Sequence, residues 1–189
     1  MPRPSIPPHP ATPQVFPAVH PMDDLYAQAG MQLPRVEVVD GATLPEPQRS
    51  LLVHSSDMTS TLVAFHGRNI HLELLRREAR GDVYLREVAL LLDGTEQSVE
   101  FGAIKIHLLN LPPEARRLIL EEHLPLGQIL KDAGVVYTSR PKAFLRIESD
   151  ELINRALRLT GAHTLYGRRN TLSNAQERPI ADIVEILPP

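Results

Sequence analysis

Two isolated charged residues lie inside apolar segments of this chain of 189 residues. Arg86 stands in the strand-like residues 83–92, and Glu185 stands in residues 183–187. A guanidinium keeps its proton when it is buried, so a buried arginine needs an anionic partner. That partner is either a protein carboxylate, such as Glu87 or Glu185, or the carboxylate of a bound ligand, which the planar guanidinium matches with two hydrogen bonds. A structural salt bridge and a small anionic ligand are therefore the two interpretations.

A β-hairpin is expected to position Arg86. The dipeptide Asp93-Gly94 favours a tight turn, and it separates apolar runs that predict strands over residues 83–92 and 98–108. Because side chains alternate between the two faces of a strand, Arg86 should share a face with several apolar neighbours. The sequence thus places this cation on a hydrophobic surface.

The other predicted elements indicate an α+β fold. Helices are expected over residues 23–29, 58–65, 113–122, 126–133 and 149–161. Ser55-Ser56 and Ser149 are the expected N-caps of the second and the last of these helices. Further strands are expected over residues 70–77, 143–148, 168–173 and 180–187. Since hairpins dominate, we expect a largely antiparallel sheet with helices packed between and over the hairpins.

The composition indicates one domain preceded by a proline-rich tail. A hydrophobic content of 42% over 189 residues suffices for one sizeable core. Eleven of the 18 prolines fall within the first 47 residues. We therefore expect residues 1–22 to be extended or disordered and residues 23–189 to form a single domain.

Several kinds of chemistry find no support in the residues. The absence of cysteine excludes disulfides, thiolate nucleophiles and cysteine-ligated metals. The eight histidines show no zinc-site spacing, and no phosphate loop or serine-nucleophile motif occurs. A net charge of −3 without charged blocks argues against a nucleic-acid partner, and no apolar run is long enough to span a bilayer. We expect a cytoplasmic monomer that uses no metal and no cofactor.

Four short motifs occur in order along residues 50–189. They are Asp57-Met58-Thr59, Leu85-Arg86-Glu87 with its Asp93-Gly94 turn, Pro125-Leu126-Gly127 and Val184-Glu185. Each motif alone is weak, but their joint order and spacing resemble the chorismate pyruvate-lyase family. The resemblance implies a chorismate lyase-like fold and an enzyme that removes pyruvate from its substrate chorismate, leaving 4-hydroxybenzoate, without a cofactor.

The resemblance also implies roles for individual residues. Arg86 would bind the ring carboxylate and Glu185 would contact the hydroxyl end, and these two are the expected catalytic residues. Backbone N–H groups near Met58 and Leu126, with the adjacent Gly127, would assist in binding the substrate. Loss of pyruvate creates an aromatic ring, so such a site needs mainly to orient the substrate and stabilise shifting charge.

Lys105 is a further candidate for substrate binding. One branch of the family carries a Gly-Arg pair in the second strand of the hairpin, whereas this chain has Gly102-Ala103. Lys105 follows Ala103 by two residues and lies on the same face of the strand. It is therefore the cation expected to replace the arginine.

Arg86 and Glu185 are expected to face one closed apolar pocket without pairing with each other. A direct pair would leave no cation for a ligand carboxylate, whereas a gap of one aromatic ring would serve both ends of the ligand. Two alternatives remain. The UTRA effector-binding domains of bacterial regulators use the same fold to bind small ligands without turning them over, and a catalytically inactive relative could carry an aromatic acid.

Overall fold

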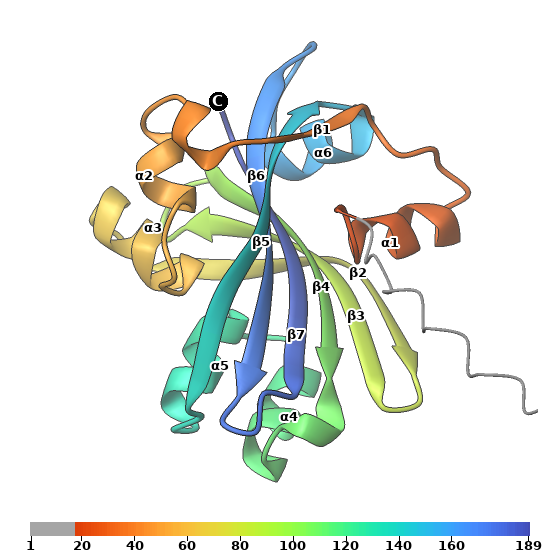
Figure 1. Ribbon diagram of the computed structural model, residues 1–189, viewed down its shortest axis with the longest axis vertical. Helices are drawn as coiled ribbons and strands as arrows, with labels where there is room; N and C mark the ends of the chain where they lie inside the picture. The colour runs from red at the N-terminus through yellow and green to blue at the C-terminus, as the bar shows by residue number, and fades with distance from the viewer. Residues whose placement is uncertain (1–17) are drawn as a thin grey trace, which may run out of the picture.

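The computed structural model describes residues 18–189, which form one seven-stranded antiparallel sheet covered by helices (Figure 1). The strand order is β1-β5-β6-β7-β4-β3-β2. The strands are β1 (Val36–Val39), β2 (Ile70–Arg80), β3 (Val83–Leu92), β4 (Ser98–His107), β5 (Tyr137–Glu148), β6 (Thr164–Asn174) and β7 (Pro179–Leu187). The helices are α1 (Met22–Gln28), α2 (Gln48–Leu52), α3 (Met58–His66), α4 (Pro113–Glu121), α5 (Leu126–Asp132) and α6 (Glu151–Leu157). The predicted α+β class is confirmed.

The hairpin of β3 and β4 forms where the sequence predicts it. β3 covers residues 83–92, and Gly94 in the turn has a φ of 73°, a left-handed conformation that glycine adopts without strain. β4 pairs with β3 and, on its other side, with β7. The hairpin that carries Arg86 is therefore held inside the sheet, next to the strand that carries Glu185.

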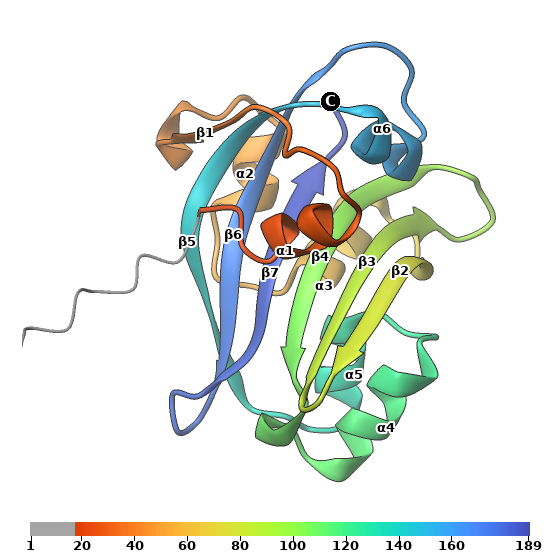
Figure 2. The same ribbon diagram turned by 90° about the vertical axis from the view of Figure 1, so that its right-hand side faces the viewer.

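Helices cover both faces of the sheet. α1 and α6 pack on one face, over a cluster that includes Leu85, Phe101 and Val184 (Figure 2). The other four helices lie on the opposite face, where α4 and α5 cover one part of the sheet and α2 and α3 another (Figure 1). Each large side chain that becomes fully buried contributes about 1.5–3 kcal/mol. Both layers therefore hold the strands that carry the charged residues in place.

Two helix caps differ from those predicted. The side chain of Asp57, not of Ser55 or Ser56, accepts a hydrogen bond from the backbone N–H of Ser60 at the start of α3. At α6 the cap is Asp150, one residue after the predicted Ser149. In both cases the carboxylate stands one position closer to the helix, where it reaches the free N–H groups of the first turn. None of the helices in residues 18–189 is long and apolar enough to cross a membrane.

Two short elements escaped prediction. β1 pairs antiparallel with β5 at the edge of the sheet, and α2 packs beside α3. Both lie in the stretch between Pro34 and Pro47 or just after it, where prolines hide the short apolar pattern. β5 also begins earlier than the predicted residue 143, because its first half alternates partly buried and exposed residues although Pro141 interrupts it.

The packed structure begins before the boundary predicted at residue 23. Met22 is fully buried, and the hydroxyl of Tyr26 donates a hydrogen bond of 2.8 Å to Asp150 Oδ2. Residues 18–22 thus belong to the domain rather than to the tail. The prediction for residues 1–17 lies outside the described part of the chain.

Candidate functional site

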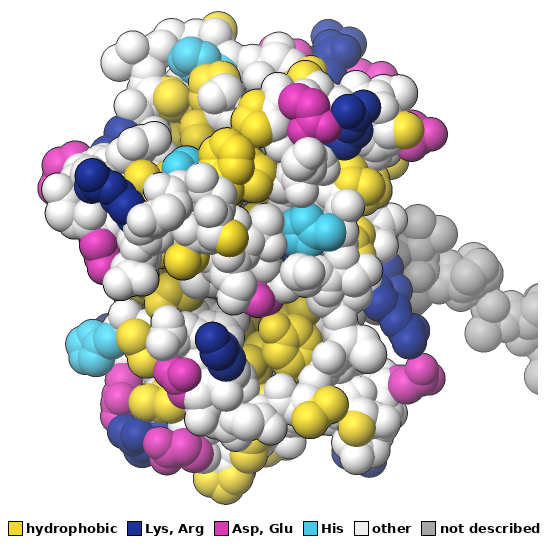
Figure 3. All heavy atoms as spheres, turned by 90° about the vertical axis from the view of Figure 1, so that its left-hand side faces the viewer, with side chains coloured by type: hydrophobic (Ala, Val, Ile, Leu, Met, Phe, Trp, Pro, Cys, Tyr) yellow, Lys and Arg dark blue, Asp and Glu magenta, His cyan; other side chains and the backbone are white. Residues whose placement is uncertain are grey.

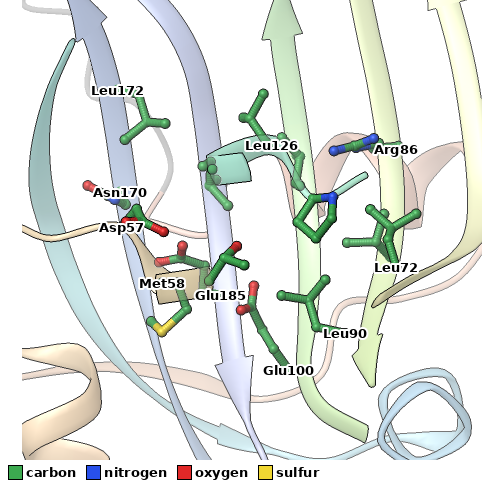
Figure 4. Close-up of a pocket in the computed structure, with 16 residues that line it drawn as sticks. Asp57, Met58, Leu72, Arg86, Leu90, Glu100, Leu126, Asn170, Leu172 and Glu185 are labelled. Carbon is green, nitrogen blue, oxygen red and sulfur yellow. The ribbon is translucent and has the colours of Figure 1, made fainter. Parts of the chain in front are cut away.

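A pocket opens on the side of the sheet that carries α3 and α5 (Figure 4). Its lining residues come from five strands, from the loop before α5 and from the starts of α3 and α5: Asp57, Met58, Thr59, Leu72, Arg86, Val88, Leu90, Glu100, Ile104, Pro125, Leu126, Gly127, Asn170, Leu172, Ile183 and Glu185. The cavity volume of the pocket is about 40 Å³. That is room for about three water molecules, so a larger ligand must push side chains apart as it enters. Figure 3 looks onto this side of the molecule, where hydrophobic side chains are visible between charged ones.

The register of the sheet sets Arg86 and Glu185 apart. Glu185 on β7 pairs with Gly102 on β4, whereas Arg86 on β3 pairs with Ile104, two residues further along β4. The two residues are therefore separated by two strand spacings and by two residues along the strands. With about 4.8 Å between strands and about 3.3 Å per residue, their Cα atoms lie roughly 12 Å apart. The predicted arrangement without direct pairing agrees with this register.

Arg86 is a buried cation without a hydrogen-bond partner among residues 18–189. Its side chain is fully buried, and none of its three guanidinium nitrogens has a partner within the described residues. Burial lowers the pKa of Arg86 to about 10, so the side chain still carries its charge at neutral pH. An unpaired buried charge is costly, and it persists in folded proteins where a ligand or function requires it.

The nearest protein anions are engaged elsewhere. Glu122, which contributes to the electrostatic environment of Arg86, accepts hydrogen bonds from Tyr84 and Arg77. Glu87, the sequence neighbour, lies on the opposite face, where its Oε2 is 3.4 Å from Arg76 Nε. Neither forms the structural salt bridge that was the alternative interpretation of Arg86.

Glu185 pairs with a second buried arginine. Arg168 on β6, directly across from it, donates its Nε–H to Glu185 Oε2. The same guanidinium donates hydrogen bonds to the carbonyl oxygens of Leu52, His54 and Ser56, at 3.2, 3.0 and 3.3 Å. Arg168 therefore ties the strand carrying Glu185 to the loop that leads into α3.

Glu100 is a pocket residue that the sequence analysis did not identify. It is buried on β4, and its Oε2 has no hydrogen-bond partner within the part of the chain that the structure describes. Burial, followed by the negative charges of Glu185 and Asp57, raises the pKa of Glu100 well above the ordinary value for a glutamate. Gly102 leaves it room, since a Cβ there would lie 3.3 Å from Glu100 Oε1. A lone glutamate inside the apolar strand 98–108 was the available signal, of the same kind as that of Arg86.

The structure brings three of the four predicted binding residues to the pocket. Met58, Leu126 and Gly127 line it at the starts of α3 and α5. A Cβ at Gly127 would lie only 2.8 Å from Asp57 Oδ1, so glycine allows the two helix starts to approach each other. Their predicted part in ligand binding stays a prediction.

Lys105 does not line the pocket, and this placement needs correction. Ile104 lines it instead, so the alternation of the strand sends Lys105 to the opposite face. There its Nζ lies 3.2 Å from His20 Nε2 and 4.0 Å from Asp24 Oδ2. The prediction that Lys105 shares a face of β4 with Ala103 is right. That face is the one covered by α1 and α6, and it is not the face of the pocket.

The side chains of His20, Asp23 and Asp24 approach one another on that opposite face. Their potential ligand atoms lie within 4.8 Å of each other. The ammonium group of Lys105 beside them already supplies a positive charge, which disfavours a metal cation there. This group is better described as part of the contact between the segment before α1 and β4.

Comparisons with known proteins relate the fold to regulatory domains. No protein-family model matches the chain, and no curated protein sequence matches it. The structure of PhnF from Mycobacterium smegmatis is similar with a TM-score of 0.56 and 11% identity, over 88% of this chain and 92% of that chain. The effector domain of the same protein gives a TM-score of 0.52 with 12% identity, over 69% of this chain and 87% of that one. A GntR-family transcriptional regulator from Enterococcus faecalis gives 0.44 with 9% identity, over 61% and 91%.

The expectation of a chorismate pyruvate-lyase is wrong. The finding that overturns it is the similarity, with TM-scores of 0.56 and 0.52, to PhnF and to the part of PhnF described as its effector domain. The motif resemblance is compatible with a shared fold and does not establish a reaction. The chain has the α+β fold of PhnF, a UTRA-type fold that is itself chorismate lyase-like.

Proposed function

We propose that this chain is a small-ligand-binding domain of the regulatory type, which holds an organic acid through Arg86 and leaves it chemically unchanged. The observation that carries the proposal is the buried guanidinium of Arg86, which lines the pocket and has no hydrogen-bond partner in the described part of the chain. A ligand carboxylate supplies the missing negative charge and accepts two parallel hydrogen bonds.

The walls of the pocket favour a ligand with an apolar body. Aliphatic side chains such as Val88, Leu90, Ile104 and Leu126 form most of the lining. Small-molecule sites commonly combine such walls with a few polar groups that fix the orientation of the ligand. Aromatic acids such as 4-hydroxybenzoate, and short aliphatic carboxylates, have this combination of an anionic end and an apolar body.

The state of Glu185 favours binding over turnover. One of its carboxylate oxygens accepts a hydrogen bond from Arg168, whose other donors hold the loop before α3. A proton acceptor in a reaction must be free to reach the substrate. Here the carboxylate is fixed to the wall by a structural ion pair.

Titration calorimetry with benzoate, 4-hydroxybenzoate, propionate and inorganic phosphate tests the proposal. We expect at least one carboxylate to bind, and Arg86→Met to weaken that binding about 10- to 150-fold, the effect of losing a charge-assisted hydrogen bond of roughly 1.5–3 kcal/mol. Arg155→Met is the matched control, because Arg155 is exposed on α6. Equal binding by wild type and Arg86→Met would contradict the proposal, as would pyruvate release from chorismate by the wild-type protein.

A further inference from the structure

Three carboxylates line the end of the pocket opposite Arg86, which we call its acidic pole. Asp57 precedes α3, Glu100 lies on β4 and Glu185 on β7, and Figure 4 shows the three grouped apart from the guanidinium. Glu100 pairs across the sheet with Leu90, four residues along β3 from Arg86. From the strand geometry, the Cα atoms of Glu100 and Arg86 are roughly 14 Å apart. That distance accommodates two inward-reaching side chains with a small molecule between them.

Two of the three carboxylates have protein partners. Glu185 is paired with Arg168, and Asp57 Oδ1 accepts a 2.8 Å hydrogen bond from the backbone N–H of Ser60. Glu100 differs, because its fully buried Oε2 has no partner. Arg168 approaches Glu185 from behind the pocket wall and is not itself a lining residue. The pocket therefore contains one unpartnered cation and one unpartnered acid at opposite ends.

The charged groups that act on Glu100 favour its neutral form in the empty pocket. Glu185 and Asp57 raise its pKa in addition to burial, and only Arg168 opposes them. His54, beside Arg168, does not add a positive charge near neutrality, because burial and Arg168 lower its pKa. A cation that enters this pole would reverse the balance and draw the proton off Glu100.

An ammonium group matches this pole better than a hydroxyl. A hydroxyl offers one hydrogen-bond donor and no charge, whereas an ammonium offers three donors and one positive charge. Three carboxylates converge here, and of these only Glu185 has an ion-pair partner among the described residues. With a carboxylate at Arg86 and an ammonium at Glu100, every buried charge lining the pocket has an opposite charge beside it, as buried charges require.

We infer that the ligand of this pocket is a small zwitterion, with its anionic group at Arg86 and its ammonium group among Glu100, Glu185 and Asp57. The inference rests on the proposed function, because it assigns the second pole of the same pocket. It narrows the ligand class from organic acids to amino acids whose two charged groups are separated by a short aliphatic chain or a ring. Binding releases the proton of Glu100.

Matched pairs of compounds test the inference by titration calorimetry. The ring pair is 4-(aminomethyl)benzoate and 4-(hydroxymethyl)benzoate, and the chain pairs are ω-amino and ω-hydroxy carboxylates with three to six carbons. We expect the amino member of at least one pair to bind at least 10-fold more tightly than its hydroxy partner. Its binding enthalpy should depend on the ionisation enthalpy of the buffer, because a proton leaves Glu100. Its affinity should rise between pH 6 and pH 8, while that of the hydroxy compound should not.

Glu100→Gln keeps the shape of the side chain and removes its charge. In this variant we expect the preference for the amino compound and the proton release to disappear. If the hydroxy member equals or exceeds the amino member in every wild-type pair, the inference is overturned whether or not the variant folds. If the wild-type protein shows no preference for the amino compounds but its carboxylate binding still depends on Arg86, the proposed function stands and only the zwitterion inference fails. If carboxylate binding does not depend on Arg86, the proposed function and the inference both fail.

Discussion

Arg168 and Arg86 are both fully buried on the same side of the sheet, yet only Arg168 has protein partners. Arg168 binds Glu185 and three backbone carbonyl groups, while the guanidinium of Arg86 has none within the described residues. Both side chains are fully buried, so burial alone does not identify a ligand-binding residue. Arg86 differs from Arg168 because no carboxylate among the described residues is hydrogen-bonded to its guanidinium.

The opposite face of the sheet follows the pattern of Arg168. Arg169, the next residue on β6, has its Nη2 3.5 Å from Asp182 Oδ1, and that same oxygen accepts a 2.8 Å hydrogen bond from Thr171. Hydrogen bonds with His107 and Thr171, together with the charge of Arg169, lower the pKa of Asp182 despite the opposing effect of its burial. A buried charge that serves the fold is thus surrounded by partners from adjacent strands, and the pocket departs from this pattern.

Removing the paired arginine should produce the largest loss of stability. Arg168→Ala leaves Glu185 buried without its counter-charge and frees the carbonyl groups of the loop before α3, so we expect the free energy of unfolding to fall by about 3–5 kcal/mol. Urea denaturation followed by circular dichroism measures it. Arg155→Ala, on the exposed side of α6, should stay within about 0.5 kcal/mol of wild type. A loss below 1 kcal/mol for Arg168→Ala would mean that the ion pair is not structural.

Removing the unpaired arginine should have the opposite sign. Arg86→Met replaces a buried charge without a partner by an apolar side chain of similar length, so we expect the ligand-free protein to gain about 1–3 kcal/mol. The same urea titration measures it in a buffer without carboxylates or phosphate. Destabilisation as large as that of Arg168→Ala would show that Arg86 has a structural anion after all.

The buried acids of the two faces should differ in their dependence on pH. Burial raises the pKa of Glu100 and of Glu87, so the folded chain holds protons that the unfolded chain releases above about pH 4.3. Stability is therefore lost as pH rises from that value toward the folded-state pKa, by at most about 1.4 kcal/mol per pH unit for each group. We expect Glu100→Gln to gain stability relative to wild type between pH 5 and pH 8.

Glu87→Gln provides the comparison on the other face. Burial raises the pKa of Glu87, and the charge of Arg76 beside it partly offsets that rise. The gain in stability of Glu87→Gln over the same pH range should therefore be smaller. Unfolding curves at four pH values suffice for both variants. Parallel profiles of stability against pH for wild type and Glu100→Gln would show that Glu100 is already ionised in the folded protein.

The sheet was predictable where the sequence alternates clearly and the turn is encoded locally. Strand β3 and the start of β4 fall where Asp93-Gly94 and the flanking apolar runs place them. The short strand β1 was missed because its partner, β5, lies more than 100 residues away in sequence. Local patterns carry no information on such a pairing, which depends on the rest of the sheet.

The pocket was predictable in part, for the same physical reason. Arg86 and Glu185 stand out because a charge inside an apolar strand conflicts with its neighbours, and Glu100 has the same signature in β4. The ion-pair partners of these charged residues could not be predicted from the sequence pattern. Arg168 pairs with Glu185 because β6 and β7 are adjacent, and the sequence does not show which buried acid meets which arginine. The presence or absence of that partner separates a salt bridge from a ligand site.

Replacing Lys105 should have the smallest effect on ligand affinity and stability. It tests whether the face of the sheet opposite the pocket contributes to ligand binding. Its ammonium group lies near His20 and Asp24, on the face opposite the pocket, and its side chain is partly exposed. We expect Lys105→Ala to change carboxylate affinity by less than about twofold and stability by less than about 1 kcal/mol, as for other partly exposed ion pairs. Calorimetry with the tightest-binding carboxylate, alongside Arg86→Met, measures the contrast. A loss of affinity comparable with that of Arg86→Met would mean that a cation on the far face contributes to binding, and that the pocket side alone does not hold the ligand.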